Sequence, residues 1–277
     1  MFLARLLVLF SLVCISCAHS SFEQKQLKHA LDFATSNRLE LEILLQHYTY
    51  DSLKLEAAKF LIRNMPHCYS YQQGGEMDSV KRVRTYYSPF GQIDQTYARR
   101  WGHYTYRNLL KIYDAHIITA EYLIDNIDRA FDNWQKRPWN RSLSFEDFCE
   151  YLLPYRIGDE PLEEWRELYE KKYGYLLDSI YKGGDVVEAA NLVSRHLQEP
   201  VFIYCEDFEL PHIGPRYLFS HRYGSCVDAA DIVTYAFRAV GIPCMEDTDA
   251  RGGHVWNVVR DTTGRDVPIC LLYTSPS

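Results

Sequence analysis

Residues 222–241, RYGSCVDAADIVTYAFRAVG, carry the pattern that decides the fold expected for this chain. Apolar side chains recur at three- and four-residue spacing from Ala229 to Val240, which is typical of a helix with one buried face. Gly241 follows the last of them and is a common helix stop. Because this face carries small residues, we expect the helix to pack closely against a sheet, with Cys226 as its first residue.

The position of Cys226 has two interpretations. The unpaired N–H groups and the positive dipole at a helix start stabilise a thiolate, and one of those amides can receive the oxyanion of a tetrahedral intermediate. A cysteine at a helix start is, however, more often a buried small side chain than a nucleophile. Taken alone, the sequence around Cys226 favours packing over catalysis.

A second motif, GGHVWNVV at residues 252–259, changes that balance. Its composition predicts a strand that begins near His254, and the segment GIPCMED at residues 241–247 predicts a shorter strand before it. The order is therefore a cysteine at a helix start, a strand, and a histidine on the next strand. Such an order brings an imidazole within reach of the thiol across the helix–sheet contact, where the two form a thiolate–imidazolium pair.

Together, GSCVDAADIVTYAFRAVGIP and HVWNVV resemble the transglutaminase-like superfamily of papain-like cysteine enzymes over residues 200–270. The rest of the chain resembles the exported transglutaminase-like lipoproteins of Bacteroides-type bacteria. The resemblance implies an α+β fold, in which a mostly helical region (residues 21–198) precedes a transglutaminase-like core (residues 199–277). In that core the cysteine helix packs on an antiparallel sheet, with Cys226 as the nucleophile and His254 as the base.

The third catalytic residue of the family is an acid on the strand after the histidine, and here the sequence departs from the pattern. The expected position falls at Cys270, which has no carboxylate. Asp266 is the nearest carboxylate, although strand alternation leaves the direction of its side chain open. The tail CLLYTSPS stops before a strand pair is complete, so we expect the C-terminal end of this chain to be truncated or aberrant.

Residues 1–20, MFLARLLVLFSLVCISCAHS, have the layout of a signal peptide: an arginine, an apolar run too short to span a membrane, and small residues. The ending CISC resembles a bacterial lipoprotein signal, in which Cys17 becomes the lipidated first residue and anchors the protein to the membrane. The alternative is an ordinary cleaved signal that ends near Ala18 or Ser20. Both predict export to the bacterial cell envelope.

Composition narrows the classes of ligand. The net charge is −7 and no basic patch is visible, so nucleic acid is not an expected partner. Outside the signal the cysteines are scattered and form no CxxC pair, which argues against a zinc site built from thiolates. We expect neither a metal nor another cofactor.

Two functions are compatible with these features. The first is cysteine-dependent acyl transfer on amide bonds, with hydrolysis of peptide, protein or glycopeptide material favoured over crosslinking. The second is a non-catalytic, surface-anchored binding or assembly module with a degenerate transglutaminase-like fold, which the missing acid supports. The presence of both Cys226 and His254 favours the enzyme.

Overall fold

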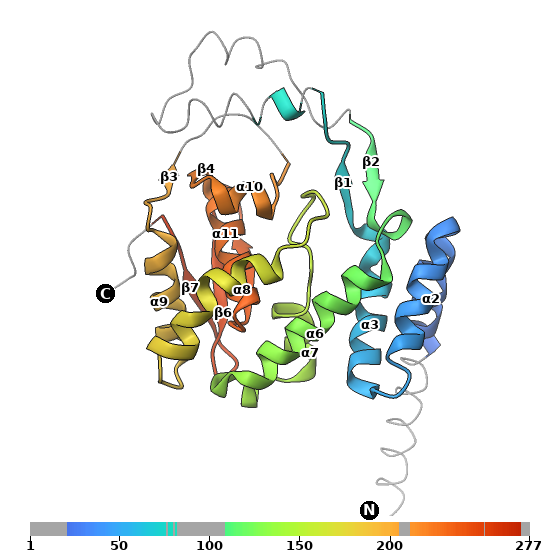
Figure 1. Ribbon diagram of the computed structural model, residues 1–277, viewed down its shortest axis with the longest axis horizontal. Coiled ribbons are helices and arrows are strands. Elements are labelled where there is room, and N and C mark those ends of the chain that lie inside the picture. Colours follow the sequence, from blue (N-terminus) through green and yellow to red (C-terminus); the bar gives the residue numbers. More distant parts are fainter. Residues whose placement is uncertain are drawn as a thin grey trace, which may run out of the picture. The chain divides into compact units, whose positions relative to one another are not determined.

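The described residues form an α+β structure with helices and three small sheets (Figure 1). The computed structural model describes residues 21–75, 77–79, 81, 109–204, 211–251 and 253–272. The expected α+β class is confirmed at this level. The proposed signal peptide and Cys17 lie outside the described residues. Among the helices of the described part, none has the length and apolar character needed to cross a membrane.

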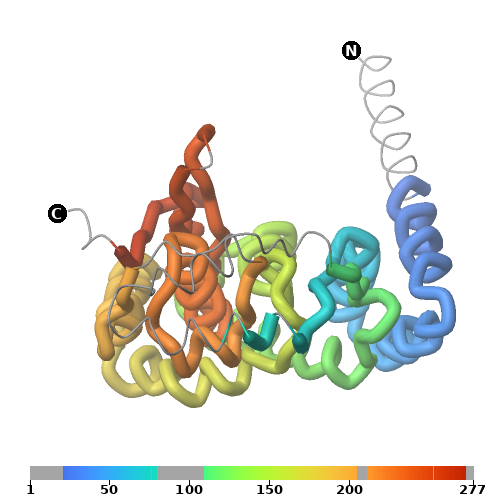
Figure 2. Tube along the Cα trace, turned by 90° about the horizontal axis from the view of Figure 1, so that it is seen from above, coloured from blue at the N-terminus to red at the C-terminus, as the bar shows by residue number. Residues whose placement is uncertain are grey.

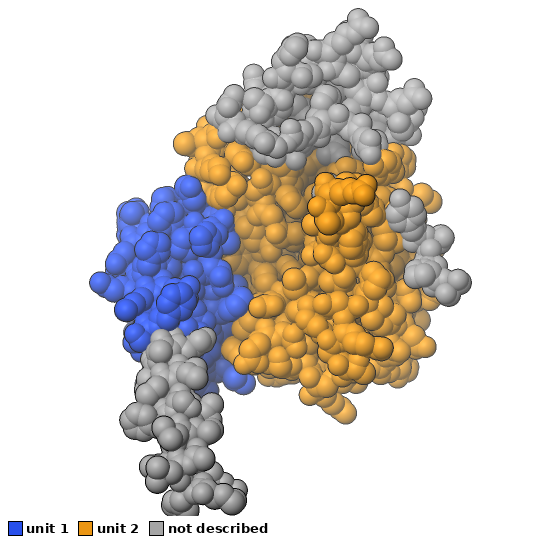
Figure 3. All heavy atoms as spheres, turned by 180° about the vertical axis from the view of Figure 1, so that it is seen from behind, with its two compact units in different colours: residues 1–68, 113–121 blue, residues 69–112, 122–277 orange. Residues whose placement is uncertain are grey.

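The chain divides into two compact units (Figure 3): unit 1 comprises residues 1–68 and 113–121, and unit 2 comprises residues 69–112 and 122–277. The boundary expected near residue 198 is therefore not the one observed. Most of the helical region belongs to the same unit as the sheet that follows it, because the helices that precede residue 198 bury their apolar faces on that later segment.

Unit 1 contains a helix over residues 21–33 and two further helices, α2 (Arg38–His47) and α3 (Ser52–Asn64). Asp51 caps α3 as the sequence predicts, because its carboxylate accepts a hydrogen bond from the Lys54 amide at 3.1 Å. The remaining short elements are one-turn 3-10 helices: η1 (Thr35–Asn37), η2 (Met65–His67) and η5 (Asp114–His116).

Apolar residues recur at helical spacing from Leu109 to Trp134, which predicts a helix over this segment, but the helix begins only at α6 (Ala120–Lys136). Residues Lys111–Tyr113 instead form strand β2, which pairs with β1 (Tyr69–Tyr71). The prediction of helix was thus wrong for the first part of this segment. A β-branched and an aromatic side chain in Lys-Ile-Tyr favour the extended form when a partner strand is available.

Two helices of unit 2 begin at a residue whose side chain caps them. Ser144 caps α7 (Phe145–Tyr151) through the Asp147 amide at 3.0 Å, and Asp185 caps α9 (Val186–Leu197) through the Val187 amide at 2.7 Å. The other helical elements are η6 (Pro138–Ser142), α8 (Arg166–Tyr175), the π-helical turn η7 (Leu176–Ile180) and α10 (Pro215–Ser220).

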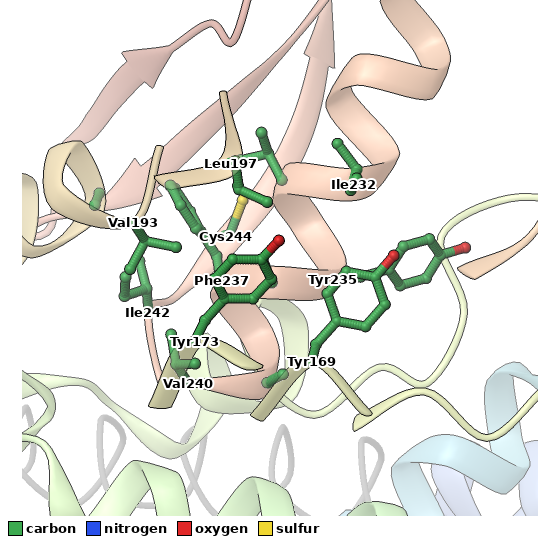
Figure 4. Packing of buried hydrophobic residues seen from close by; sticks show 14 of the residues in the cluster. Tyr169, Tyr173, Val193, Leu197, Ile232, Tyr235, Phe237, Val240, Ile242 and Cys244 are labelled. Atoms are coloured by element: carbon green, nitrogen blue, oxygen red, sulfur yellow. The ribbon is translucent and has the colours of Figure 1, made fainter. Parts of the chain in front are cut away.

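Helix α11 (Cys226–Ala239) lies at the centre of unit 2, and every residue from Asp228 to Ala239 is buried. A helix buried on all sides needs cover from several elements. Helices α8 and α9 supply part of it, with Tyr169, Tyr173, Val193 and Leu197 packed around Ile232 and Phe237 (Figure 4).

A three-stranded antiparallel sheet covers another side of α11; it consists of β5 (Cys244–Thr248), β6 (Val255–Arg260) and β7 (Asp266–Ile269). Figure 2 shows these strands beside α11. Gly241, at a φ of 82°, makes the turn that ends the helix, as the sequence predicts. A separate parallel pair, β3 (Ile203–Tyr204) and β4 (Tyr223–Gly224), leads into the start of α11.

Candidate functional site

Cys226 is the first residue of α11, as the sequence predicts. The chain arrives extended through β4, and the Asp228 carboxylate then accepts hydrogen bonds from the Ser225 amide at 2.8 Å and the Ser225 hydroxyl at 3.0 Å. These bonds fix the first turn around the cysteine. Cys226 is half-buried and carries a free thiol, so the sulfur is neither a fully enclosed core group nor part of a disulfide.

His254 directly precedes β6 and is half-buried. Its ring lies 6.0 Å from the ring of Trp256, and its Nε2 lies 3.7 Å from the sulfur of Cys270. It also borders a pocket of about 530 Å³ whose other lining residues are Gln198, Val201, Phe202, Tyr204, Leu271 and Leu272. The imidazole therefore has access to a largely apolar space.

The side chain of Asn257 sets the alignment of β6 with α11. Its amide donates to the Ala230 carbonyl at 3.0 Å and to the Thr234 hydroxyl at 2.8 Å. Strand β5 runs back along the helix, and β6 runs antiparallel to β5, so β6 and α11 have the same direction. Cys226 lies one helical turn before Ala230, and His254 lies just before β6. Both residues are thus at the same end of the α11–β6 pair.

Asp266 is at the other end of this pair. In the β6–β7 register it faces Arg260, the last residue of β6, and its carboxylate accepts from the Tyr151 hydroxyl at 3.0 Å. Burial and this bond raise the pKa of Tyr151 to about 12. Asp266, the carboxylate that the sequence offers as the third catalytic residue, therefore lies far along the strand from His254. It does not orient the His254 ring.

The structure instead brings Cys270 against His254, at the position where the resemblance expects an acid. A thiol is a weak hydrogen-bonding group and lacks the negative charge with which a carboxylate stabilises an imidazolium. The site therefore contains the expected thiol and imidazole at one end of α11, with the Cys270 sulfur as the neighbour of the His254 Nε2.

A buried cluster of titratable groups, absent from the sequence-based candidates, lies further along α11. Nδ1 of His212 is 2.8 Å and 2.9 Å from the two carboxylate oxygens of Asp231, whose side chain is fully buried. Glu246 of β5 accepts from the Thr234 hydroxyl at 3.2 Å, and the neighbouring Asp231 contributes to the raised pKa of Glu246. The signal in the sequence was an acidic residue, Asp231, within the helix that the small and apolar residues mark for burial.

In the described part of the chain, no group of histidine, cysteine and acidic side chains has the arrangement to hold a metal ion. Comparisons with known proteins found no family model, no curated protein and no solved structure that matches this chain.

Proposed function

We propose that this protein is an exported cysteine-dependent enzyme that transfers acyl groups from amide bonds, most simply to water. The observation that carries the proposal is the alignment of β6 with α11 by Asn257, which puts the cysteine at the helix start and the histidine before the strand at one end of the pair. This arrangement fits a papain-like, transglutaminase-like core.

In the proposed reaction His254 takes the proton of the Cys226 thiol, and the thiolate attacks the carbonyl carbon of the amide. The N–H groups of the first turn of α11 stabilise the oxyanion that forms. The C–N bond then breaks, and His254 gives its proton to the departing amine. Water, deprotonated by His254, attacks the resulting thioester and releases the carboxylic acid with the free thiol.

Peptide, protein or glycopeptide amides are the proposed substrates, because an anchored protein of the cell envelope meets such material. Cys17 is the proposed lipid anchor. The chemistry described needs no metal or cofactor.

The decisive test is the rate at which iodoacetamide alkylates Cys226 at pH 6, followed by peptide mass mapping. A thiolate–imidazolium pair labels rapidly at this pH, whereas an ordinary thiol is almost fully protonated. We expect Cys226→Ala to abolish the fast labelling and His254→Asn to slow it. Cys68, which is also half-buried and whose thiol donates to the Asn64 carbonyl at 3.6 Å, serves as the internal control. Equal rates at Cys226 and Cys68 would rule out the enzymatic proposal.

One observation favours a second function, a non-catalytic binding or assembly module. His254 has a sulfur rather than a carboxylate beside Nε2, so the group that would hold the imidazolium in place is replaced. Slow labelling of Cys226 in a folded protein would support this alternative.

A further inference from the structure

The cluster of His212, Asp231 and Glu246, here called the Asp231 cluster, has a buried Asp231 and two half-buried partners, and it lies between the elements that carry the proposed catalytic residues. Asp231 belongs to α11, the helix that begins with Cys226. Glu246 belongs to β5 and faces Asn257 of β6 in the strand register. The cluster therefore joins the helix of the cysteine to the strand that follows the histidine.

The hydrogen bonds of the cluster join both strands to the helix. The Asn257 amide donates to the Thr234 hydroxyl, and that hydroxyl donates onward to Glu246. Glu246 and Asp231 are neighbouring carboxyl groups, and two such groups share a site most favourably when one of them is protonated. Because Asp231 also pairs with His212, which favours the ionised form of Asp231, we expect the proton on Glu246.

The pKa shifts of these three groups agree with a proton on Glu246. Burial raises the pKa of Asp231, and burial together with the neighbouring Asp231 raises the pKa of Glu246 well above its usual range. Burial alone would lower the pKa of His212, but attraction to Asp231 outweighs it and raises the pKa well above the ordinary value. These shifts favour a charged His212 and a protonated Glu246.

The surroundings of the cluster add further charged groups. Glu160, from the segment before α8, acts on the pKa values of both His212 and Asp231, and Asp228 of α11 acts on that of Asp231. Arg238, near the end of α11, opposes the raised pKa of Glu246. The backbone amide of His212 donates to the Asp159 carboxylate at 2.9 Å.

We propose that the Asp231 cluster, linked through Thr234 to Asn257, is the positioning element that holds His254 in line with Cys226. The inference that this alignment controls thiol reactivity rests on the proposed function. The donors and acceptors connect Glu246 of β5 to Thr234 of α11 and Thr234 to Asn257 of β6, so loss of the Thr234 hydroxyl removes one of the two bonds by which Asn257 ties β6 to the helix. None of these residues is proposed to touch the substrate.

Thr234 offers a matched pair of variants for the test. Thr234→Val keeps the shape of the side chain and removes the hydroxyl that joins Glu246 to Asn257. Thr234→Ser keeps the hydroxyl and removes the methyl group. We expect Thr234→Val to shift the pH profile of Cys226 alkylation toward that of an ordinary thiol, with a rate at pH 6 about tenfold or more lower, since one pKa unit is a tenfold change in thiolate.

Thr234→Ser and Glu246→Gln should keep the wild-type profile, because glutamine donates and accepts hydrogen bonds as a neutral glutamic acid does. A merely structural role predicts instead that Thr234→Val and Thr234→Ser lower the melting temperature without moving the profile, and this outcome would overturn the proposal. A profile shifted equally by Glu246→Gln would also overturn it, because the proton would then not belong on Glu246.

Hydrogen exchange separates failure of this inference from failure of the proposed function. If the wild-type Cys226 reacts as an ordinary thiol, the proposed function fails. The exchange of the amides at residues 254–257 then still tests positioning: faster exchange in Thr234→Val than in Thr234→Ser supports it, and equal exchange rejects it.

Discussion

The side-chain amide of Asn257 donates to the backbone carbonyl of Ala230 at 3.0 Å, and this bond ties strand β6 to helix α11. Asn257 is 1% exposed, so water does not replace the bond when it is lost. The proposed partnership of Cys226 with His254 depends on this tie, because each residue precedes one of the two connected elements.

Replacement of Asn257 by alanine should therefore destabilise the protein and slow the labelling of Cys226. We expect a loss of about 1–3 kcal/mol in the free energy of unfolding, the usual cost when a buried hydrogen bond is broken. Urea unfolding measures it. Asn64→Ala is the control, because the Asn64 amide also bonds to a backbone carbonyl, Phe60 at 2.9 Å, but at an exposed site. A similar loss in both variants would contradict the role given to Asn257.

Cys270→Asp should increase the reactivity of Cys226. A carboxylate next to Nε2 of His254 stabilises the imidazolium and thus the thiolate that pairs with it. We expect the alkylation rate at pH 6 to rise about tenfold for each unit by which the pKa of Cys226 falls. Asp266→Asn is the control and should leave the rate unchanged, since Asp266 lies beside Arg260 and Tyr151. An unchanged rate in Cys270→Asp would show that residue 270 is not where the proposed site lacks its acidic residue.

Glu246→Gln should be more stable than the wild type at pH 7, and the difference should disappear near pH 4. Above the ordinary pKa of glutamate, near 4.3, the unfolded chain ionises whereas the folded carboxyl keeps its proton. The raised pKa therefore costs stability as the pH rises, and glutamine has no such cost. Urea unfolding between pH 4 and pH 7 tests this, and a difference that does not change with pH would contradict a protonated Glu246.

The charge of His212 should also make the folded protein less stable as the pH rises. Its pKa is raised in the folded state, so its stabilising contribution is complete below the ordinary histidine pKa, near 6.5, and is lost as the pH rises through the folded value. His212→Gln should thus remove the alkaline part of the pH dependence of wild-type stability. The same slope in both proteins above pH 7 would show that His212 is not the group that loses its charge.

Gly158→Ala should also weaken the Asp231 cluster. A Cβ atom at this position would lie 2.4 Å from the Cδ2 and Nε2 atoms of His212, so the ring would have to leave its present position beside Asp231. We expect a loss of about 1–3 kcal/mol, which is typical of overpacking. Gly184→Ala is the matched control, because nothing lies within 4 Å of its added Cβ. Equal stability of the two variants would mean that the loop accommodates the methyl group.

Local signals in the sequence were sufficient for several elements. The start of α11 at Cys226, its stop at Gly241 and the N-caps at Asp51 and Ser144 all appear where the residue types predict them. Capping and turn preferences act within a few residues of the chain, so no tertiary contact is needed to recognise them. The same holds for the strand that follows His254.

The relationships between elements required the tertiary structure. The sequence could not exclude Asp266 as the partner of His254, because the register of the β6–β7 hairpin decides which end of the strand it occupies. Nor could it place the boundary between the units, since α8 and α9 are amphipathic helices whose partner α11 lies later in the chain.

The sequence by itself determined which residue types stand at the helix start and before the strand, and thus the chemistry that Cys226 and His254 can offer. The tertiary structure alone decided that they share one end of the α11–β6 pair, that Cys270 rather than Asp266 adjoins His254, and that Asp231 pairs with His212. The physical reason is that local conformation depends on neighbours in the chain. Charge pairing and strand register depend on groups that meet only when distant segments pack together.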